Sequence, residues 1–184
     1  MKRVLLAAAV AMIGLGAGAA AAAPQTGQGL DETLGFIRDK VAQQGLIYYS
    51  AALHDSANGA NWGNQFNVEA SNVTVDIPAC QLNFHWHTVV DGKVAYDGEG
   101  GVPFGKVNQV VVIGMEADTL RLSVEAGHPT WTNKVTPAVW VVTTHRTSGP
   151  DNSLDFRDRD LAERVARAMR HAAQLCGGTK SEAF

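Results

Sequence analysis

Two histidines in the segment Gln81–Tyr96 have a spacing that metal sites use. The segment is expected to form a hairpin whose first strand alternates along its two faces, so His85 and His87 place their imidazoles on one face, about 6–7 Å apart. Such a pair can bind one zinc or copper ion if a third and usually a fourth ligand approach it. The alternative is two histidines on the polar face of a hairpin. Candidates for the further ligands are His54, His128, His145, Asp91 and Asp97.

Two tryptophans and three arginines are candidate contacts for a ligand or a partner. Trp62 and Trp131 stand in polar segments, where an indole can stack on a sugar or enter an interface; the alternative is that they close one end of a barrel. Arg164, Arg167 and Arg170 are spaced to lie mostly on the outer side of a C-terminal helix, where they could meet an anionic surface or partner. A solvated helix face that complements the helix dipole is the alternative.

Motifs that would identify an enzyme are missing from the sequence. It contains no Gly-x-Ser-x-Gly, no phosphate-binding glycine loop and no His-Glu-x-x-His. A Ser-His-Asp site assembled from distant segments stays open, because such groups need only be close in space and no spacing selects one. The pattern favours a protein that is not an enzyme without deciding the point.

The N-terminal segment has the pattern of a secretory signal peptide. Two basic residues at positions 2 and 3 precede an apolar run, and small residues follow it up to Pro24. We predict cleavage after Ala22, which removes residues 1–22 and leaves residues 23–29 as a flexible mature N-terminus. The mature chain is then expected to be periplasmic or secreted, with no transmembrane anchor.

Export changes the interpretation of the two cysteines. In an oxidising compartment, Cys80 and Cys176 are expected to form one disulfide, and two buried free thiols are the alternative. A bridge across about 96 residues would stabilise the fold by about 4–5 kcal/mol in the loop-entropy treatment.

The formal net charge of −3 argues against a nucleic-acid binder, which depends on neutralising phosphates.

Residues 30–178 are expected to form one domain that begins and ends with a helix. One helical stripe recurs in the segment 30–41, and a second recurs between about Asp158 and Cys176. From residue 46 to 156 the pattern is that of short strands between turn residues, including Gln65–Ala70, Val73–Ile77 and Leu120–Glu125. About seven strands make an α+β, mainly β fold, either a small antiparallel barrel or two packed sheets. The dipeptide Asp91-Gly92 predicts a two-residue hairpin turn.

Two segments of the chain resemble a known group of proteins. The closing run from Leu154 to Gly178 reads LDFRDRDLAERVARAMRHAAQLCGG, and the opening run from Leu30 to Lys40 reads LDETLGFIRDK. They resemble the last and first helical segments of uncharacterised bacterial exported proteins with a pleckstrin-homology-like barrel. The resemblance implies a half-open barrel capped by the C-terminal helix, and it carries no catalytic residues. Residues 179–184 are expected to be a disordered tail.

These features together predict an exported, non-catalytic binding or assembly module whose partner is an unknown protein or small ligand. One alternative is a small metal-binding or metal-dependent protein that uses His85 and His87. A second alternative is a carrier that holds a small ligand in the mouth of the barrel.

Overall fold

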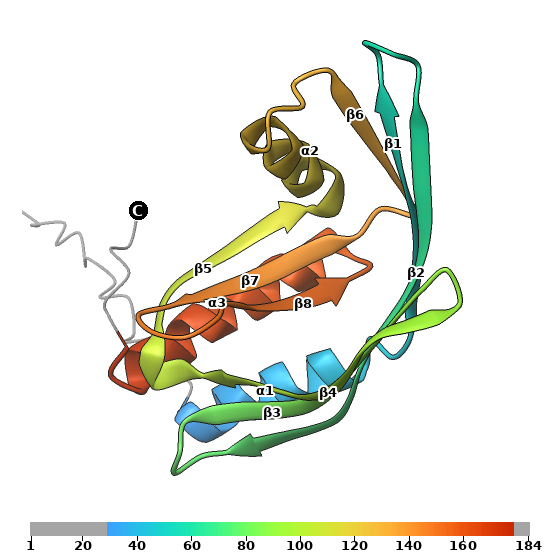
Figure 1. The fold of residues 1–184 in the computed structure, drawn as a ribbon. Coiled ribbons are helices and arrows are strands. Elements are labelled where there is room, and N and C mark those ends of the chain that lie inside the picture. The colour runs from blue at the N-terminus through green and yellow to red at the C-terminus, as the bar shows by residue number, and fades with distance from the viewer. Residues whose placement is uncertain (1–28, 179–184) are drawn as a thin grey trace, which may run out of the picture.

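The computed structural model describes residues 29–178, which form two antiparallel sheets and three α-helices (Figure 1). The first sheet has the strand order β4-β3-β2-β1-β6 and the second has the order β5-β7-β8. The strands of the first sheet are β1 (Ile47–Asp55), β2 (Asn61–Asp76), β3 (Gln81–Val90), β4 (Lys93–Pro103) and β6 (Trp131–Thr136). Those of the second are β5 (Val107–Gly114), β7 (Trp140–Arg146) and β8 (Asn152–Phe156). The helices are α1 (Leu30–Ala42), α2 (Met115–Glu125) and α3 (Arg159–Leu175), with a 3-10 turn at Phe104–Lys106.

The predicted α+β, mainly β class is confirmed, with eight strands in place of about seven. In the part of the chain that the structure describes, the sheets do not close into a barrel, because β4 and β6 end one strand order and β5 and β8 end the other. The predicted signal peptide, the start of the mature chain before residue 29 and the tail 179–184 lie outside the described residues.

Strand β2 is a single strand of 16 residues where the sequence predicted two. The pairing of β2 with β3 shifts between Ser71 and Thr74, and Asn72 between them has a φ of 51°. Asparagine tolerates this left-handed conformation better than most residues, so a bulge absorbs the extra residue and the strand continues. The polar Ser71-Asn72 pair therefore marks a bulge and not a loop.

The prediction of a strand at Leu120–Glu125 was wrong, because these residues belong to α2. Alternating apolar and polar residues suggested a strand with one buried face. In the helix, Arg121 instead makes ion pairs with Asp118 (3.0 Å) and Glu125 (2.8 Å), one turn away on either side. These local polar contacts support the helix, while Leu122 and Val124 are left 51% and 55% exposed.

Helices α1 and α3 lie side by side and cover one face of the strands, while α2 stands near β5 and β6 at the other end (Figure 1). The main core forms beneath the helix pair, and both predicted helical stripes contribute to it. Its largest fully buried side chains include Leu34 and Ile37 from α1, Met169 from α3, and Phe104 and Phe156. A smaller apolar cluster joins β1, β2, β6 and the residue before β7: Ile47, Tyr49, Val68, Val135 and Val139.

Several predicted local features are confirmed. A disulfide joins Cys80, in the turn before β3, to Cys176 at the C-terminal end of α3. Asp91 and Gly92 form the β3–β4 turn with φ values of 50° and 76°. The cap of α3 differs from the capping box that the spacing of Asp160 and Glu163 suggests: it is Asp158, whose Oδ1 accepts a hydrogen bond from the backbone N–H of Leu161 (2.7 Å). No helix within residues 29–178 is long and apolar enough to span a membrane.

Candidate functional site

The solvent-facing side of β3 and β4 carries a cluster of histidines and carboxylates. His85 and His87 on β3 are in register with Glu99 and Asp97 on β4. The Oδ1 atom of Asp97 lies 2.5 Å from Nε2 of His85 and 3.5 Å from Nδ1 of His87. The Oε1 atom of Glu99 lies 3.3 Å from Nδ1 of His85. One carboxylate oxygen therefore contacts both imidazoles.

This arrangement favours a proton on His85 over a metal ion. The hydrogen bond to Asp97, with a second to Glu99, raises the pKa of His85 above its usual value, and the bond to His85 lowers the pKa of Asp97. An imidazole that donates from both nitrogens has no lone pair left for a metal. Among residues 29–178, no group of three or more His, Cys, Asp or Glu side chains could hold a metal ion.

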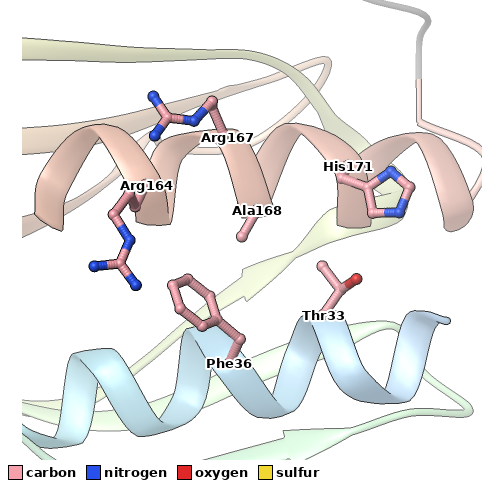
Figure 2. A pocket seen from close by; sticks show the side chains of 6 residues that line it. All are labelled: Thr33, Phe36, Arg164, Arg167, Ala168 and His171. Carbon is pink, nitrogen blue, oxygen red and sulfur yellow. The ribbon is translucent and has the colours of Figure 1, made fainter. Parts of the chain in front are cut away.

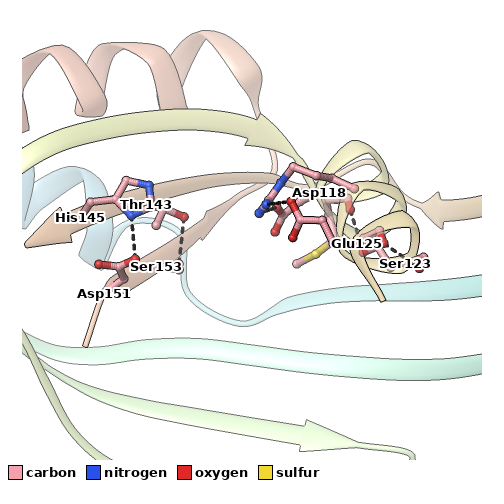
Figure 3. A network of polar contacts seen from close by, with 10 residues as sticks. Asp118, Ser123, Glu125, Thr143, His145, Asp151 and Ser153 are labelled. Carbon is pink, nitrogen blue, oxygen red and sulfur yellow. Dashed lines mark hydrogen bonds and ion pairs between the residues drawn. The ribbon is translucent and has the colours of Figure 1, made fainter. Parts of the chain in front are cut away.

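Of the further ligands that the sequence offered, Asp97 is the one placed beside the histidine pair. His54 is hydrogen-bonded to an asparagine of β2. His145 is bonded to the aspartate that precedes β8, at 2.6 Å (Figure 3). Asp91 accepts hydrogen bonds from an asparagine side chain and a backbone N–H of β2. His128 stacks on a tryptophan of β6. The predicted ligands are thus distributed over several surfaces.

Trp62 and Trp131 meet at the end of the β1–β2 hairpin. Their ring centroids are 5.2 Å apart, and the ring of His128 stacks on Trp131 at 4.0 Å. Trp62 is 46% exposed, and within the described residues neither tryptophan belongs to either core cluster. The register places Trp62 and Trp131 on the same face of the sheet as Tyr49 and Val135, so the three rings form an aromatic surface on that face, beyond the smaller core cluster.

The three predicted contact arginines of α3 have different surroundings. The Nη1 atom of Arg170 donates a hydrogen bond to the carbonyl of Val110 (3.0 Å) and so fastens α3 to β5. Arg164 and Arg167 line a groove between α1 and α3, and the guanidinium of Arg164 lies 5.6 Å from the ring centroid of Phe36 (Figure 2). Arg164 is therefore directed into the groove, whereas Arg167 borders it with its side chain turned away from α1 (Figure 2).

A cleft with largely apolar walls lies between α2 and the segment that leads from β6 into β7. Its volume is about 410 Å³, within the range of about 300–1,000 Å³ that is typical of small-molecule sites. The side chains that form its apolar walls are Met115, Leu120, Val135, Ala138, Val139 and Trp140. Sequence reasoning missed this cleft because one wall is α2, which was expected to be a strand. We call it the α2 cleft.

The charge at the α2 cleft is negative. Among the described residues that line it, Glu116 is the only ionisable one. On the polar side of α2, Arg121 forms ion pairs with Asp118 and Glu125, so its positive charge is already balanced (Figure 3). An apolar molecule that is neutral or positively charged therefore suits this cleft better than an anion.

A buried carboxyl group in β8 was also missed by sequence reasoning. Asp155 is 9% exposed and borders a very small cavity with Gln44, Ile47 and Trp86. Burial raises the pKa of Asp155 to about 6. The pKa of the nearby Tyr49 is also raised, first by burial and then by the charge of Asp155. The cavity has room for no more than a water molecule, so Asp155 bears on stability and not on ligand binding.

Comparison with protein-family models, with curated proteins and with solved structures finds no match to this chain.

Proposed function

We propose that the chain is an exported, non-catalytic binding module that takes a small apolar ligand into the α2 cleft. The observation that carries this proposal is the cleft itself, a volume of about 410 Å³ with apolar walls beside an exposed apolar helix surface. A ligand in the cleft removes the side chains of Leu120, Ala138 and Trp140 from water, which contributes about 25 cal/mol for each Å² of apolar surface covered. The ligand is neutral or cationic, because Glu116 lies at the cleft.

The same residues support a role without catalysis. General acid–base or nucleophilic chemistry needs at least two polar groups held in mutual hydrogen-bond reach. Glu116 is the single ionisable group of the α2 cleft, and the remaining lining residues are apolar or glycine. Such a lining suits reversible binding.

The direct test is a fluorescence titration with N-phenyl-1-naphthylamine, a neutral probe that brightens in an apolar environment. We expect saturable binding of one probe per chain, and weaker binding of the anionic probe 1-anilinonaphthalene-8-sulfonate. The variant Ala117→Trp places a large side chain at an exposed helix position that lines the cleft, and it is expected to reduce probe affinity at least tenfold.

A matched pair of variants supplies the control. Leu120 lines the α2 cleft, whereas Leu122 lies on the same helix but does not line it. Leu120→Gln is expected to weaken the probe, while Leu122→Gln leaves its affinity within twofold. Equal losses in the two variants, or no saturable binding by the unaltered protein, would overturn the proposal.

Export to the periplasm or the medium is part of the same proposal. The Cys80–Cys176 disulfide supports it, because disulfides persist in oxidising compartments. The test is to fractionate cells that express the full-length gene and to sequence the N-terminus of the product. We expect Ala23 as its first residue in the exported fraction, and an uncleaved product in the cytoplasm would contradict the proposal.

The relation to pleckstrin-homology-like exported proteins also stays a proposal. What supports it is an arrangement of two antiparallel sheets that ends in an amphipathic helix packed on them. An experimental structure tests it by showing whether the two sheets follow the half-open barrel of that fold.

A further inference from the structure

A second opening lies between α1 and α3. Its lining includes arginines, whereas the α2 cleft has largely apolar walls and one glutamate. The residues that line it are Thr33 and Phe36 from α1 and Arg164, Arg167, Ala168 and His171 from α3, and its volume is about 320 Å³. Figure 2 shows Thr33 and Phe36 directed from α1 towards α3, with Arg164 and His171 reaching into the same space from the other side. We call this opening the interhelical groove.

The groove carries positive charge, and none of the described residues that line it is a carboxylate. The guanidinium of Arg164 packs over the ring of Phe36, so the positive charge lies beside an apolar side chain of the groove. Within residues 29–178, neither Arg164 nor Arg167 has an ion pair with an acidic side chain. Asp160 and Glu163 lie towards the start of α3 and line an adjacent surface depression together with the same two arginines. Neither acid forms an ion pair with Arg164 or Arg167 in the described part of the chain.

Thr33 gives an independent indication that the groove has a ligand. Its side chain is 1% exposed, and its Oγ1 atom has no hydrogen-bond partner in the described part of the chain. A buried hydroxyl without a partner costs about 1–3 kcal/mol, so such groups are uncommon in folded proteins. Thr33 lines the groove, and an acceptor bound there would satisfy the hydroxyl.

We infer that the interhelical groove binds a small phosphate-bearing molecule with an apolar substituent. The phosphate oxygens accept hydrogen bonds from the guanidinium of Arg164 and from the hydroxyl of Thr33, and Arg167 adds positive charge at the rim. The apolar substituent lies against Phe36 and Ala168. This site is separate from the α2 cleft and does not depend on the function proposed for it.

The test is an NMR titration of the purified protein with phenyl phosphate at pH 7.5, followed through backbone amide signals. Inorganic phosphate tests the phosphate group of this ligand alone, and benzyl alcohol tests its aromatic part alone. We expect saturable shifts confined to α1 and α3. Phenyl phosphate should bind several-fold more tightly than inorganic phosphate or benzyl alcohol. Vesicles that contain an anionic phospholipid form a further arm, which shows whether a lipid phosphate can replace the free ester.

Three variants separate a built site from general charge attraction. Arg164→Gln is expected to weaken phenyl phosphate at least tenfold, as the loss of a charged hydrogen bond predicts. Thr33→Val keeps the shape but removes the hydroxyl, so it is expected to weaken binding about fivefold without lowering the melting temperature. Arg38→Gln on α1 removes the same charge from an arginine that is already paired with Asp39, and it is expected to change affinity less than twofold.

The outcomes are clear in each direction. Localised shifts with losses at Arg164 and Thr33, and none at Arg38, support the site. The inference is overturned if no probe shifts α1 and α3 together, if Arg38→Gln weakens binding as much as Arg164→Gln, or if Thr33→Val leaves affinity unchanged.

Discussion

Helices α3 and α2 are built from similar amino acids but use them in opposite ways. Helix α3 buries its apolar stripe, including Val165 and Met169, and turns its charged residues to the surface. Helix α2 buries Ser123, whose hydroxyl donates to the carbonyl of Thr119, and leaves Leu122 exposed. Helix α3 also has a capping side chain at its start, whereas α2 has none.

The difference teaches where stability and where binding reside in this molecule. A helix whose apolar side chains are buried contributes to folding, and its exposed charges are then available to a polar ligand. A helix that leaves apolar side chains in water contributes less to folding, but offers surface to an apolar ligand. The five predictions that follow test this contrast, beginning with the largest expected effect.

Loss of the disulfide is expected to have the largest effect, because it releases the end of α3 from the turn before β3. The bridge closes a loop of 96 residues, which the loop-entropy treatment values at about 4–5 kcal/mol. We expect Cys80→Ser with Cys176→Ser to lower the free energy of unfolding by an amount of that order. Urea denaturation of the variant and of the oxidised protein measures it, and an unchanged midpoint would contradict the prediction.

Truncation of a buried side chain in α3 comes next. Met169 is fully buried in the main core, so Met169→Ala is expected to cost about 2–5 kcal/mol. The matched change in α2 is Val124→Ala, at a position that is 55% exposed, and we expect less than about 0.5 kcal/mol. Denaturation curves of the two variants compare the helices directly. Equal costs would mean that α2 is packed as firmly as α3.

The strand that leads into α3 makes stability depend on pH. Burial raises the pKa of Asp155 to about 6, above the unfolded value of 3.8, so the folded protein holds this proton more tightly. The contribution of Asp155 to stability is therefore fully present below about pH 4 and falls by an amount on the order of 3 kcal/mol as the pH rises through about 6. We expect Asp155→Asn to remove this fall. Denaturation at pH 4.5 and pH 7.5 tests it, and a fall of the same size in the variant would show another group to be responsible.

Removal of the cap of α3 is expected to have a moderate effect. The carboxylate of Asp158 accepts a hydrogen bond from the N–H of Leu161, so Asp158→Ala should lower the free energy of unfolding by about 1 kcal/mol. The corresponding residue of α2 is Gly114, which has no side chain to cap the helix. Gly114→Asp should stabilise α2 if the added carboxylate reaches the first turn, and thermal denaturation of both variants measures the two changes.

The smallest effect on stability is expected on the exposed face of α2. Leu122→Ser with Val124→Ser removes two apolar side chains that lie in water, so the free energy of unfolding should change by less than about 0.5 kcal/mol. The same double variant should lower the tendency of the protein to associate at high concentration, because it removes an exposed apolar patch. Light scattering measures association, and a large loss of stability would show these side chains to be packed.

The sequence predicted those parts of the fold in which a local pattern and its buried surface agree. The stripes of α1 and α3, the Asp91-Gly92 turn and the Cys80–Cys176 pair are of this kind. Helix α2 was missed because its alternating residues match a strand, while the ion pairs of Arg121 that support the helix are local contacts of the helical form. The bulge at Asn72 was missed because it is defined by the register between β2 and β3, which the sequence of β2 alone does not show.

The candidate sites were less predictable, since each is assembled from several segments. Arg164 and Arg167 were recognised from their helical spacing, but nothing in the sequence showed that Thr33 would lie across from them with its hydroxyl unpaired. The histidine pair was recognised, yet only the register of β4 shows that carboxylates occupy its nitrogens. Contacts between side chains on different helices and strands determine these sites, and the amino-acid composition does not show those contacts.

The disulfide also divides the chain mechanically. A force that pulls on the two ends travels along the backbone only as far as Cys80 and then crosses the bridge to Cys176. Backbone tension therefore passes through α1, β1 and β2 and bypasses the backbone from β3 to α3, which is pulled only through contacts such as the pairings of β1 with β6 and of β2 with β3. In the oxidised protein, stretching should release only the segment before Cys80, with the rest held as a closed ring.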